Sequence, residues 1–408
     1  MEGCVFIMSE RDILCSFSGG GYRATFFHAG VLRKLVDFGL KNRIKTISSV
    51  SGGSIVSALF GVYFDEIQTV ESYDRLIIAP LIQFSQKNIR NKLLLYKPLT
   101  LLKIKSNNGI MIEQLNHDLF HGKTIDDFSK NVQIIINATN LNDGIGWQFT
   151  NQNFGDDRTG YSYDVENIPI ALAVTASACF PGLFSPIKLN IQDYKFYHKN
   201  KNRKDDPIPN VTPNFVYLAD GGIFDNLGYF SLEQEFEQNS DALFIVSDAA
   251  TRFKQNQKIY YFLNEAVRII DILMAQIVSR DRKIISCDME LKKWQGIYMK
   301  MESSCRFYRE LEANKEGISE NLPQIGWSDS VVERIAKMRT DLNTFTESEI
   351  QALVCHGETL VETSIAKWHS AFYQTLSRGE SVGYYTDMKK NEKKIFDKLE
   401  KSKELVKL

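Results

Sequence analysis

Apolar and polar positions follow two alternating patterns in the first half of the chain. Short, continuous apolar runs at residues 13–17 and 44–50 are each followed by glycines and then by a stretch with helical apolar spacing. Continuous runs of this length are typical of buried strands, and the later spacing is typical of helices. The pattern therefore predicts strand–turn–helix units, which build an α/β layer around a mostly parallel sheet.

Three further apolar runs predict later strands at residues 132–137, 216–219 and 243–247. Residues 61–131 show no clear strand pattern before the first of these runs. We expect that segment to form a helical, lid-like insertion above the sheet.

The pattern changes after about residue 250. Apolar positions there recur at helical spacing, with Lys, Glu and Gln between them. We expect residues 1–250 to form the catalytic domain, and residues 251–408 to form a helical C-terminal region packed on it or beside it.

The composition is that of a globular protein, with 43% hydrophobic and 24% charged residues. With 49 Lys and Arg against 50 Asp and Glu, the net charge of −1 gives no global support to nucleic-acid binding. No apolar run reaches the roughly 18 residues of a membrane-spanning helix. We also expect no secretory signal, because no basic segment precedes an apolar stretch at the N-terminus.

The cysteine spacing bears on the cellular compartment. Six cysteines are scattered over the chain, and no two form a C-x-x-C pair. This favours reduced thiols over a disulfide framework or a structural zinc site, so we expect a cytoplasmic protein.

A serine stands between the second predicted strand and its helix. Ser51 is followed by Gly52 and Gly53, which is the context of a nucleophile elbow of the G-x-S-x-G type. Ser49 occupies the position of the first glycine in that pattern. A sharp turn there would expose the hydroxyl of Ser51 beside the positive end of a helix. The alternative is an ordinary glycine-rich turn between a strand and a helix.

Three consecutive glycines follow the first predicted strand. Gly19, Gly20 and Gly21 could present backbone N–H groups to an anion, which suits an oxyanion hole for acyl transfer. A phosphate-binding loop is the weaker alternative, because the segment lacks G-K-[ST] and is no clean G-x-G-x-x-G.

An aspartate ends the apolar run at 216–219. Asp220 lies where carboxyl ends of strands form sites in α/β proteins, so it is the better candidate for a general base. Asp225 lies further into the turn and is expected to make local hydrogen bonds. Taken alone, D-G-G is also a common turn.

None of the six histidines lies in a motif that marks a catalytic base. This leaves a dyad in which Asp220 takes the proton of Ser51 directly. His117 and His121 are spaced like metal ligands on a helix, but no third ligand is signalled, so we expect no metal site.

Taken in chain order, these three segments resemble the patatin-like phospholipase family, which combines a glycine loop with arginine, a serine elbow and a D-G-[GA] aspartate. Residues 119–124, 138–141 and 176–181 are also similar to segments of that family. The resemblance covers about residues 10–250. It implies a three-layer α/β fold with a mostly parallel central sheet and hydrolysis of lipid acyl esters without a metal or cofactor.

The resemblance also implies a role for each motif residue. Ser51 would be the nucleophile and Asp220 the base. Arg23 would support the glycine loop or the lipid head group. The oxyanion hole would comprise Gly19, Gly20, Gly21, Arg23 and Gly52.

A segment rich in basic and apolar residues suggests how the protein reaches its substrate. Residues 87–105 contain lysines and an arginine between leucines and no acidic residue. Such a composition suits peripheral docking on an anionic membrane. The alternative is an ordinary lid whose leucines face the core.

We therefore expect a serine lipid acyl hydrolase of the phospholipase A or lysophospholipase type. One alternative is a catalytically silent lipid-binding module, for which Ser49 is the only local hint. Others are a signal-activated effector that damages membranes and a nucleotide-binding regulator using the glycine loop. The sequence leaves head-group preference and oligomeric state open.

Overall fold

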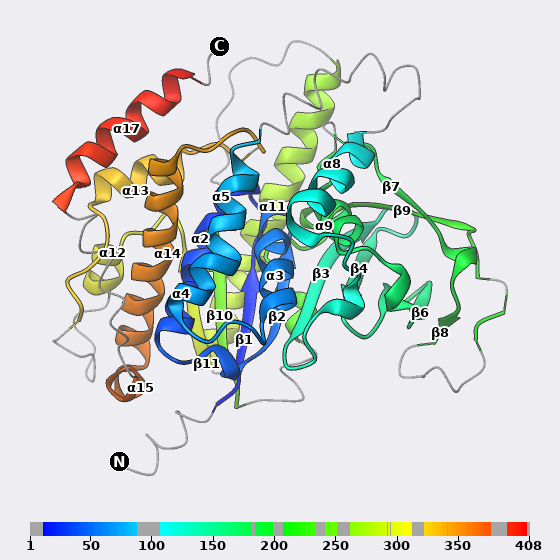
Figure 1. Cartoon of the computed structure of the whole chain (residues 1–408), viewed down its shortest axis with the longest axis horizontal. Coiled ribbons are helices and arrows are strands. Elements are labelled where there is room, and N and C mark those ends of the chain that lie inside the picture. Colours follow the sequence, from blue (N-terminus) through cyan, green and yellow to red (C-terminus); the bar gives the residue numbers. More distant parts are fainter. Residues whose placement is uncertain are drawn as a thin grey trace.

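The computed structural model places a large mixed sheet between two layers of helices (Figure 1). The structure describes residues 11–87, 107–181, 184–198, 207–209, 211–233, 241–250, 262–291, 293, 295–311, 322–340, 342–376 and 390–405.

The central strands run parallel, and those inside the sheet are buried because helices cover both faces. Their order is β11-β10-β1-β2-β3, and the strands beyond β3 pair antiparallel. The strands are β1 (Ile13–Phe17), β2 (Ile44–Val50), β3 (Gln133–Asn140), β4 (Ile145–Thr150), β5 (Phe154–Asp156), β6 (Gly160–Ser162), β7 (Ile187–Asn190), β8 (Phe196–Tyr197), β9 (Phe215–Asp220), β10 (Leu243–Asp248) and β11 (Gln295–Lys300).

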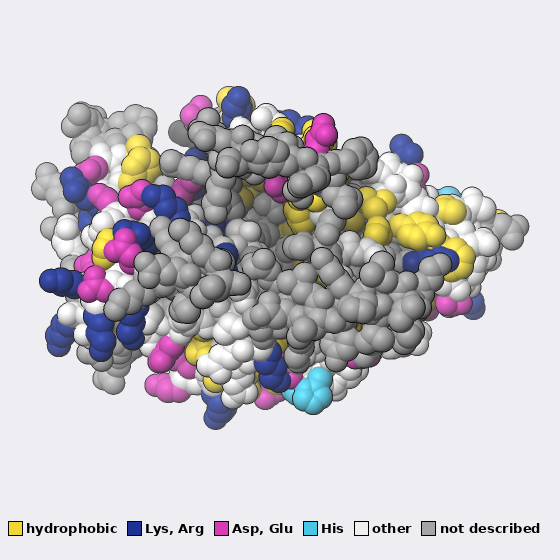
Figure 2. All heavy atoms as spheres, turned by 90° about the horizontal axis from the view of Figure 1, so that it is seen from above, with side chains coloured by type: hydrophobic (Ala, Val, Ile, Leu, Met, Phe, Trp, Pro, Cys, Tyr) yellow, Lys and Arg dark blue, Asp and Glu magenta, His cyan; other side chains and the backbone are white. Residues whose placement is uncertain are grey.

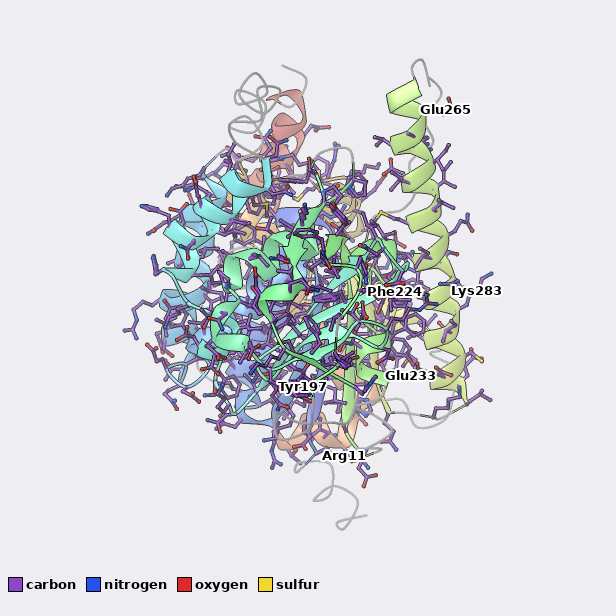
Figure 3. The ribbon with its side chains drawn as sticks, turned by 90° about the vertical axis from the view of Figure 1, so that its right-hand side faces the viewer. Arg11, Tyr197, Phe224, Glu233, Glu265 and Lys283 are labelled. Carbon is purple, nitrogen blue, oxygen red and sulfur yellow. The ribbon has the colours of Figure 1, made fainter. Side chains whose placement is uncertain are left out.

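One face of the sheet packs against helices that follow the first two strands. Those helices are α2 (Gly21–Asp37) and α3 (Gly52–Tyr63), and α14 (Glu347–Trp368) packs against α2. The other face packs against α11 (Phe262–Glu290), on the side opposite these helices (Figure 3). The α/β fold with a mostly parallel central sheet and a helical C-terminal region is therefore confirmed.

The other α- and π-helices lie in the two regions expected to be helical, except α9, which lies between β6 and β7. They are α4 (Val70–Tyr73), η2 (Asp74–Ile78), α5 (Ala79–Ser85), α8 (Asn107–Leu115), η3 (Asn116–Phe120), α9 (Ile170–Ala178), α12 (Cys305–Glu310), α13 (Asp329–Ala336), α15 (Ser370–Thr375) and α17 (Glu392–Leu405). No strand interrupts the described part of residues 61–131.

The C-terminal region contributes more than helices. Its strand β11 pairs in parallel with β10 and extends the central sheet, which the apolar pattern does not predict. Within α11, Ile269 is 49% exposed and Leu273 is 57% exposed, whereas Val278 and Ile285 are buried. Among the described side chains of α11, the buried ones therefore lie in its second half.

Charges of both signs are interspersed over the described surface that Figure 2 shows, beside a band of hydrophobic side chains. Among the helices that the structure describes, none is both long and apolar enough to cross a membrane.

Candidate active site

Ser51 occupies a strained turn between β2 and α3. Its φ is 50° and its ψ is −116°, a conformation that residues with a side chain rarely adopt. Ser51 is only partly buried. Such strain concentrates at functional sites, where the surrounding structure holds it in place.

The two glycines after Ser51 allow this turn to approach neighbouring backbone. A Cβ on Gly52 would lie 2.1 Å from the carbonyl oxygen of Gly21, and one on Gly53 would lie 2.7 Å from that of Phe17. Any side chain at these positions would displace the turn or the glycine loop. The glycines are therefore required sterically. α3 begins at Gly52, directly after the serine.

Ser177, on α9, hydrogen-bonds to the serine turn. Its hydroxyl oxygen accepts the backbone N–H of Ser51 at 2.9 Å and lies 3.0 Å from the hydroxyl oxygen of Ser54. Its own proton goes to the carbonyl of Asn137 on β3, at 2.6 Å. One side chain thereby links the turn, α3 and the sheet.

Asp220 ends β9 beside the same turn. Its backbone is fixed by Thr139, whose hydroxyl donates to the Asp220 carbonyl at 2.8 Å, and by the carbonyl of Cys179, which accepts its N–H at 3.0 Å. The carboxylate is 4% exposed and accepts the N–H of Gly222 at 2.8 Å. The side chain of Ser51 lies close enough to this carboxylate to lower its pKa.

The topology explains how Ser51 and Asp220 meet. β2 pairs with β3, and β3 pairs with β9 in a register that places Ala138 opposite Asp220. The carboxyl ends of β2 and β9 are therefore close in space.

Burial determines the acidity of Asp220. Loss of solvent raises the pKa of its carboxyl group to about 7, although the N–H of Gly222 and the side chain of Ser51 act in the opposite direction. A pKa near neutrality suits a group that takes and returns a proton during catalysis.

The glycine loop joins β1 to α2 and lies against Ser51. Gly20 and Gly21 have φ values of 142° and 57°, which favour glycine. A Cβ on Gly19 would lie 3.3 Å from the Cβ of Ser51. The loop therefore borders the position where a substrate carbonyl would meet the hydroxyl of Ser51.

The N–H groups around Ser51 differ in their hydrogen bonding. The N–H of Gly19 donates to the carbonyl oxygen of Asn226 at 3.0 Å. Within the described part of the chain, those of Gly20, Gly21 and Gly52 have no protein acceptor. These three donors, unlike that of Gly19, remain open to an anion.

Arg23 lies in the first turn of α2 and is fully buried. Its guanidinium group donates to the carbonyl of Ala249 at 2.6 Å and to those of Ala336 and Met338 at 3.4 and 3.3 Å. A Cβ on Gly20 would lie 3.5 Å from its Nη2. Of the two roles expected for Arg23, this position favours support of the loop.

Ser177 and Asn226 link the serine turn, the end of β9 and the glycine loop, and neither stands out in the sequence. Ser177 lies in the 176–181 segment, where only the family resemblance draws attention to it. Asn226 follows the D-G-G turn, and its carbonyl receives the N–H of Gly19. Asp225 accepts three backbone N–H groups, from Leu227, Gly228 and Phe230, as expected for a local turn residue.

Among the described residues, no histidine hydrogen-bonds to Ser51 or Asp220. His28 is buried, with its ring nitrogens 2.9 Å from the hydroxyl of Ser247 and 3.0 Å from the carbonyl of Ser18. The described side chains also contain no group of three or more His, Cys, Asp or Glu residues that could hold a metal.

The expected docking segment, residues 87–105, lies outside the described residues except for Lys87. The ammonium group of Lys87 is 2.5 Å from a carboxylate oxygen of Asp118.

A family model for patatin-like phospholipases matches residues 15–232, which include the glycine loop, the serine turn and Asp220. The chain belongs to the patatin-like phospholipase family. This is a family of lipid acyl hydrolases, as the resemblance implies.

Among solved structures, human GIVD cytosolic phospholipase A2 is similar, with a TM-score of 0.50 and 11% identity over 90% of this chain. The patatin-like chain spans 60% of the length of that human chain. VipD from Legionella pneumophila aligns with a TM-score of 0.32 and 14% identity, over 72% of this chain and 61% of VipD. A comparison with curated proteins gave no match. The likeness to the human enzyme shows the fold.

Proposed function

We propose that this protein is a serine lipid acyl hydrolase of the phospholipase A or lysophospholipase type, acting through a Ser51–Asp220 dyad. The Ser51 side chain lies beside the buried Asp220 carboxylate, close enough to lower its pKa, and this placement carries the proposal. The open N–H groups beside that pair support it, because acyl transfer needs donors at the developing oxyanion.

In the first half-reaction, the Oγ of Ser51 attacks the carbonyl carbon of a fatty-acyl ester while Asp220 takes the hydroxyl proton. The N–H groups of Gly20, Gly21 and Gly52 stabilise the oxyanion. When the tetrahedral intermediate collapses, the ester C–O bond breaks and Asp220 gives its proton to the leaving alcohol. The fatty acid remains esterified to Ser51.

In the second half-reaction, water replaces the alcohol. Asp220 takes a proton from the water, which attacks the acyl-enzyme, and then returns that proton to the Oγ of Ser51. A fatty acid leaves and the free serine is restored. The same carboxylate serves as base and acid in both halves, which its pKa of about 7 suits.

We also propose that the enzyme works in the cytoplasm, peripherally at a membrane surface. Its lipid substrate would be found there, and the basic and apolar residues 87–105 have the composition of an interfacial segment.

Product analysis tests the proposed reaction. Mixed phospholipids are incubated with wild type and with Ser51→Ala, and free fatty acids and lysolipids are measured by mass spectrometry. We expect both products to accumulate with wild type only. Equal product formation by Ser51→Ala would refute the role of Ser51, and no lipid product from folded wild type would refute the activity.

A further inference from the structure

A segment of the C-terminal region lies directly on the helix turn that follows the glycine loop. This segment, here called the strap, comprises residues 336–340 and 342–346, between α13 and α14. Phe345 of the strap packs between two buried aromatic rings of α2. Its ring centroid is 5.9 Å from that of Tyr22 and 6.4 Å from that of Phe26.

The strap also binds the arginine of the glycine-loop motif. The carbonyls of Ala336 and Met338 accept hydrogen bonds from Nη1 of Arg23, whose Nη2 donates to Ala249. A Cβ on Gly20 would lie 3.5 Å from Nη2 of the same guanidinium group. Arg23 therefore lies between the strap, to which it hydrogen-bonds, and the glycine loop, which it lies beside.

The strap is itself fixed on both sides. Arg339 donates to the carboxylate of Glu349 at 2.6 Å, and its guanidinium lies 4.0 Å from the ring centroid of Phe345. Glu349 completes a capping box with Thr346 at the start of α14. The N–H of Phe345 donates to the carbonyl of Ser85 at 3.3 Å. These contacts hold Phe345 at one position against α2.

The glycine loop has no side chains of its own to fix it. Its donors keep their direction only if the first turn of α2 stays in place, since Gly21 begins that helix. Preorganised donors contribute to catalysis because they need not rearrange when charge develops. A displacement of about 1 Å at such a site can cost roughly a hundredfold in rate.

We propose that the strap positions the oxyanion loop, with Phe345 and Arg339 as positioning residues that act through Tyr22 and Arg23. This inference rests on the proposed hydrolase function. It makes the C-terminal region part of the catalytic unit, although the matched family segment ends at residue 232.

A pair of matched substitutions tests this role. Phe345→Leu and Phe372→Leu each shorten a buried aromatic side chain of the C-terminal region. Phe345 packs on the first turn of α2, whereas Phe372 lies on α15, which contacts the last turn of α2 through Tyr373 and Phe38. The kcat and KM for a soluble p-nitrophenyl ester are measured with the thermal unfolding midpoint of each variant.

We expect Phe345→Leu to lower kcat about tenfold or more while KM stays within about twofold, because donors to the transition state are misplaced. Phe372→Leu should leave kcat within about twofold, at a similar loss of thermal stability. Wild-type kcat in Phe345→Leu, or an equal loss in both variants, would overturn the inference.

A second variant decides the case if Phe345→Leu does not fold. Arg339→Lys keeps the charge beside Glu349 but loses the planar group over Phe345, and we expect the same selective loss of kcat. Unchanged kcat in that variant would then overturn the inference. Failure of the proposed function is distinguishable, because wild type and Ser51→Ala would then have the same activity.

Discussion

At the scale of single residues, two side chains of opposite character define the site. Ser51 is held in a strained conformation and is partly exposed, whereas Asp220 is buried so that its pKa rises to about 7. Both effects come from the surroundings, since neither residue type has these properties in a free chain.

The pKa of Asp220 predicts how activity depends on pH. A base must be ionised to accept a proton, and Asp220 is protonated below its pKa. We therefore expect kcat/KM to be constant above about pH 7 and to fall about tenfold per unit below it. The measurement is a profile of ester hydrolysis from pH 5 to 9.

The control for this profile is Asp220→Asn, which has the same size and does not titrate. Its residual hydrolysis should show no inflection near pH 7. If kcat/KM of wild type stays constant down to pH 5 and falls only near the ordinary aspartate pKa, burial does not raise the pKa of Asp220 and this account is contradicted.

The sequence predicts Ser51 and Asp220 as candidates because each follows an apolar strand and precedes glycines. Ser177 and Asn226 carry no such signal. Their roles arise from hydrogen bonds to residues more than a hundred positions away, Ser177 with Ser51 and Asn226 with Gly19. A local pattern cannot specify partners that only the tertiary fold brings together.

At the scale of elements, close backbone approach between two turns shapes the site. The serine turn and the glycine loop touch where Gly52 faces Gly21. A methyl group at Gly52 would meet backbone atoms, which cannot move aside as a side chain can.

We therefore expect Gly52→Ala to lower kcat/KM by at least about a hundredfold, because it displaces an oxyanion donor. Kinetics on a soluble ester, with circular dichroism to verify folding, provide the measurement. The control is Gly122→Asn, since Gly122 has a φ of 83° with open space around it and Asn tolerates that conformation. Near wild-type activity in folded Gly52→Ala would show that this contact is not needed.

Elements with a strong apolar pattern are predicted well, and β11 shows where the pattern fails. β1 and β2 read as strands because helices cover both of their faces, which requires continuous apolar runs. β11 begins with Gln295 and Gly296 and ends with Lys300, at the edge of the sheet. An edge strand meets fewer neighbours, so its sequence carries less of the signal.

At the scale of the whole molecule, the sheet, its helices and the strap form one unit around the site. The C-terminal region supplies β11, α11 and α14 in addition to the strap. The sequence predicts this region as helical and packed on or beside the catalytic domain. Its contact with Arg23 could not be foreseen, because the acceptors are backbone carbonyls, which every residue carries.

Membrane attachment is a second proposal at the scale of the whole molecule, and it rests on the sequence of residues 87–105. Reversing charge at Lys97, Lys103 and Lys105 to Glu should weaken binding to anionic vesicles. A lysine near such a surface contributes about 1 kcal/mol, so the three changes should reduce binding roughly a hundredfold. Co-sedimentation with phosphatidylserine vesicles measures this.

A matched triple reversal controls for net charge. Lys45, Lys130 and Lys283 are exposed elsewhere, and changing them to Glu gives the same net charge. The Lys45, Lys130 and Lys283 variant should bind anionic vesicles more tightly than the Lys97, Lys103 and Lys105 variant. Equal binding of the two variants and wild type would contradict docking through residues 87–105 without affecting the catalytic proposal.

The central claim is that Ser51 is the nucleophile, activated by Asp220. The most direct measurement is intact and peptide mass spectrometry after incubation with an alkyl fluorophosphonate, whose phosphorus is attacked by an activated serine with loss of fluoride. The account predicts one label per wild-type chain, located on Ser51, and none on Ser51→Ala. Labelling of Ser51→Ala as fast as wild type, or a label on another residue with Ser51 unmodified, would contradict it.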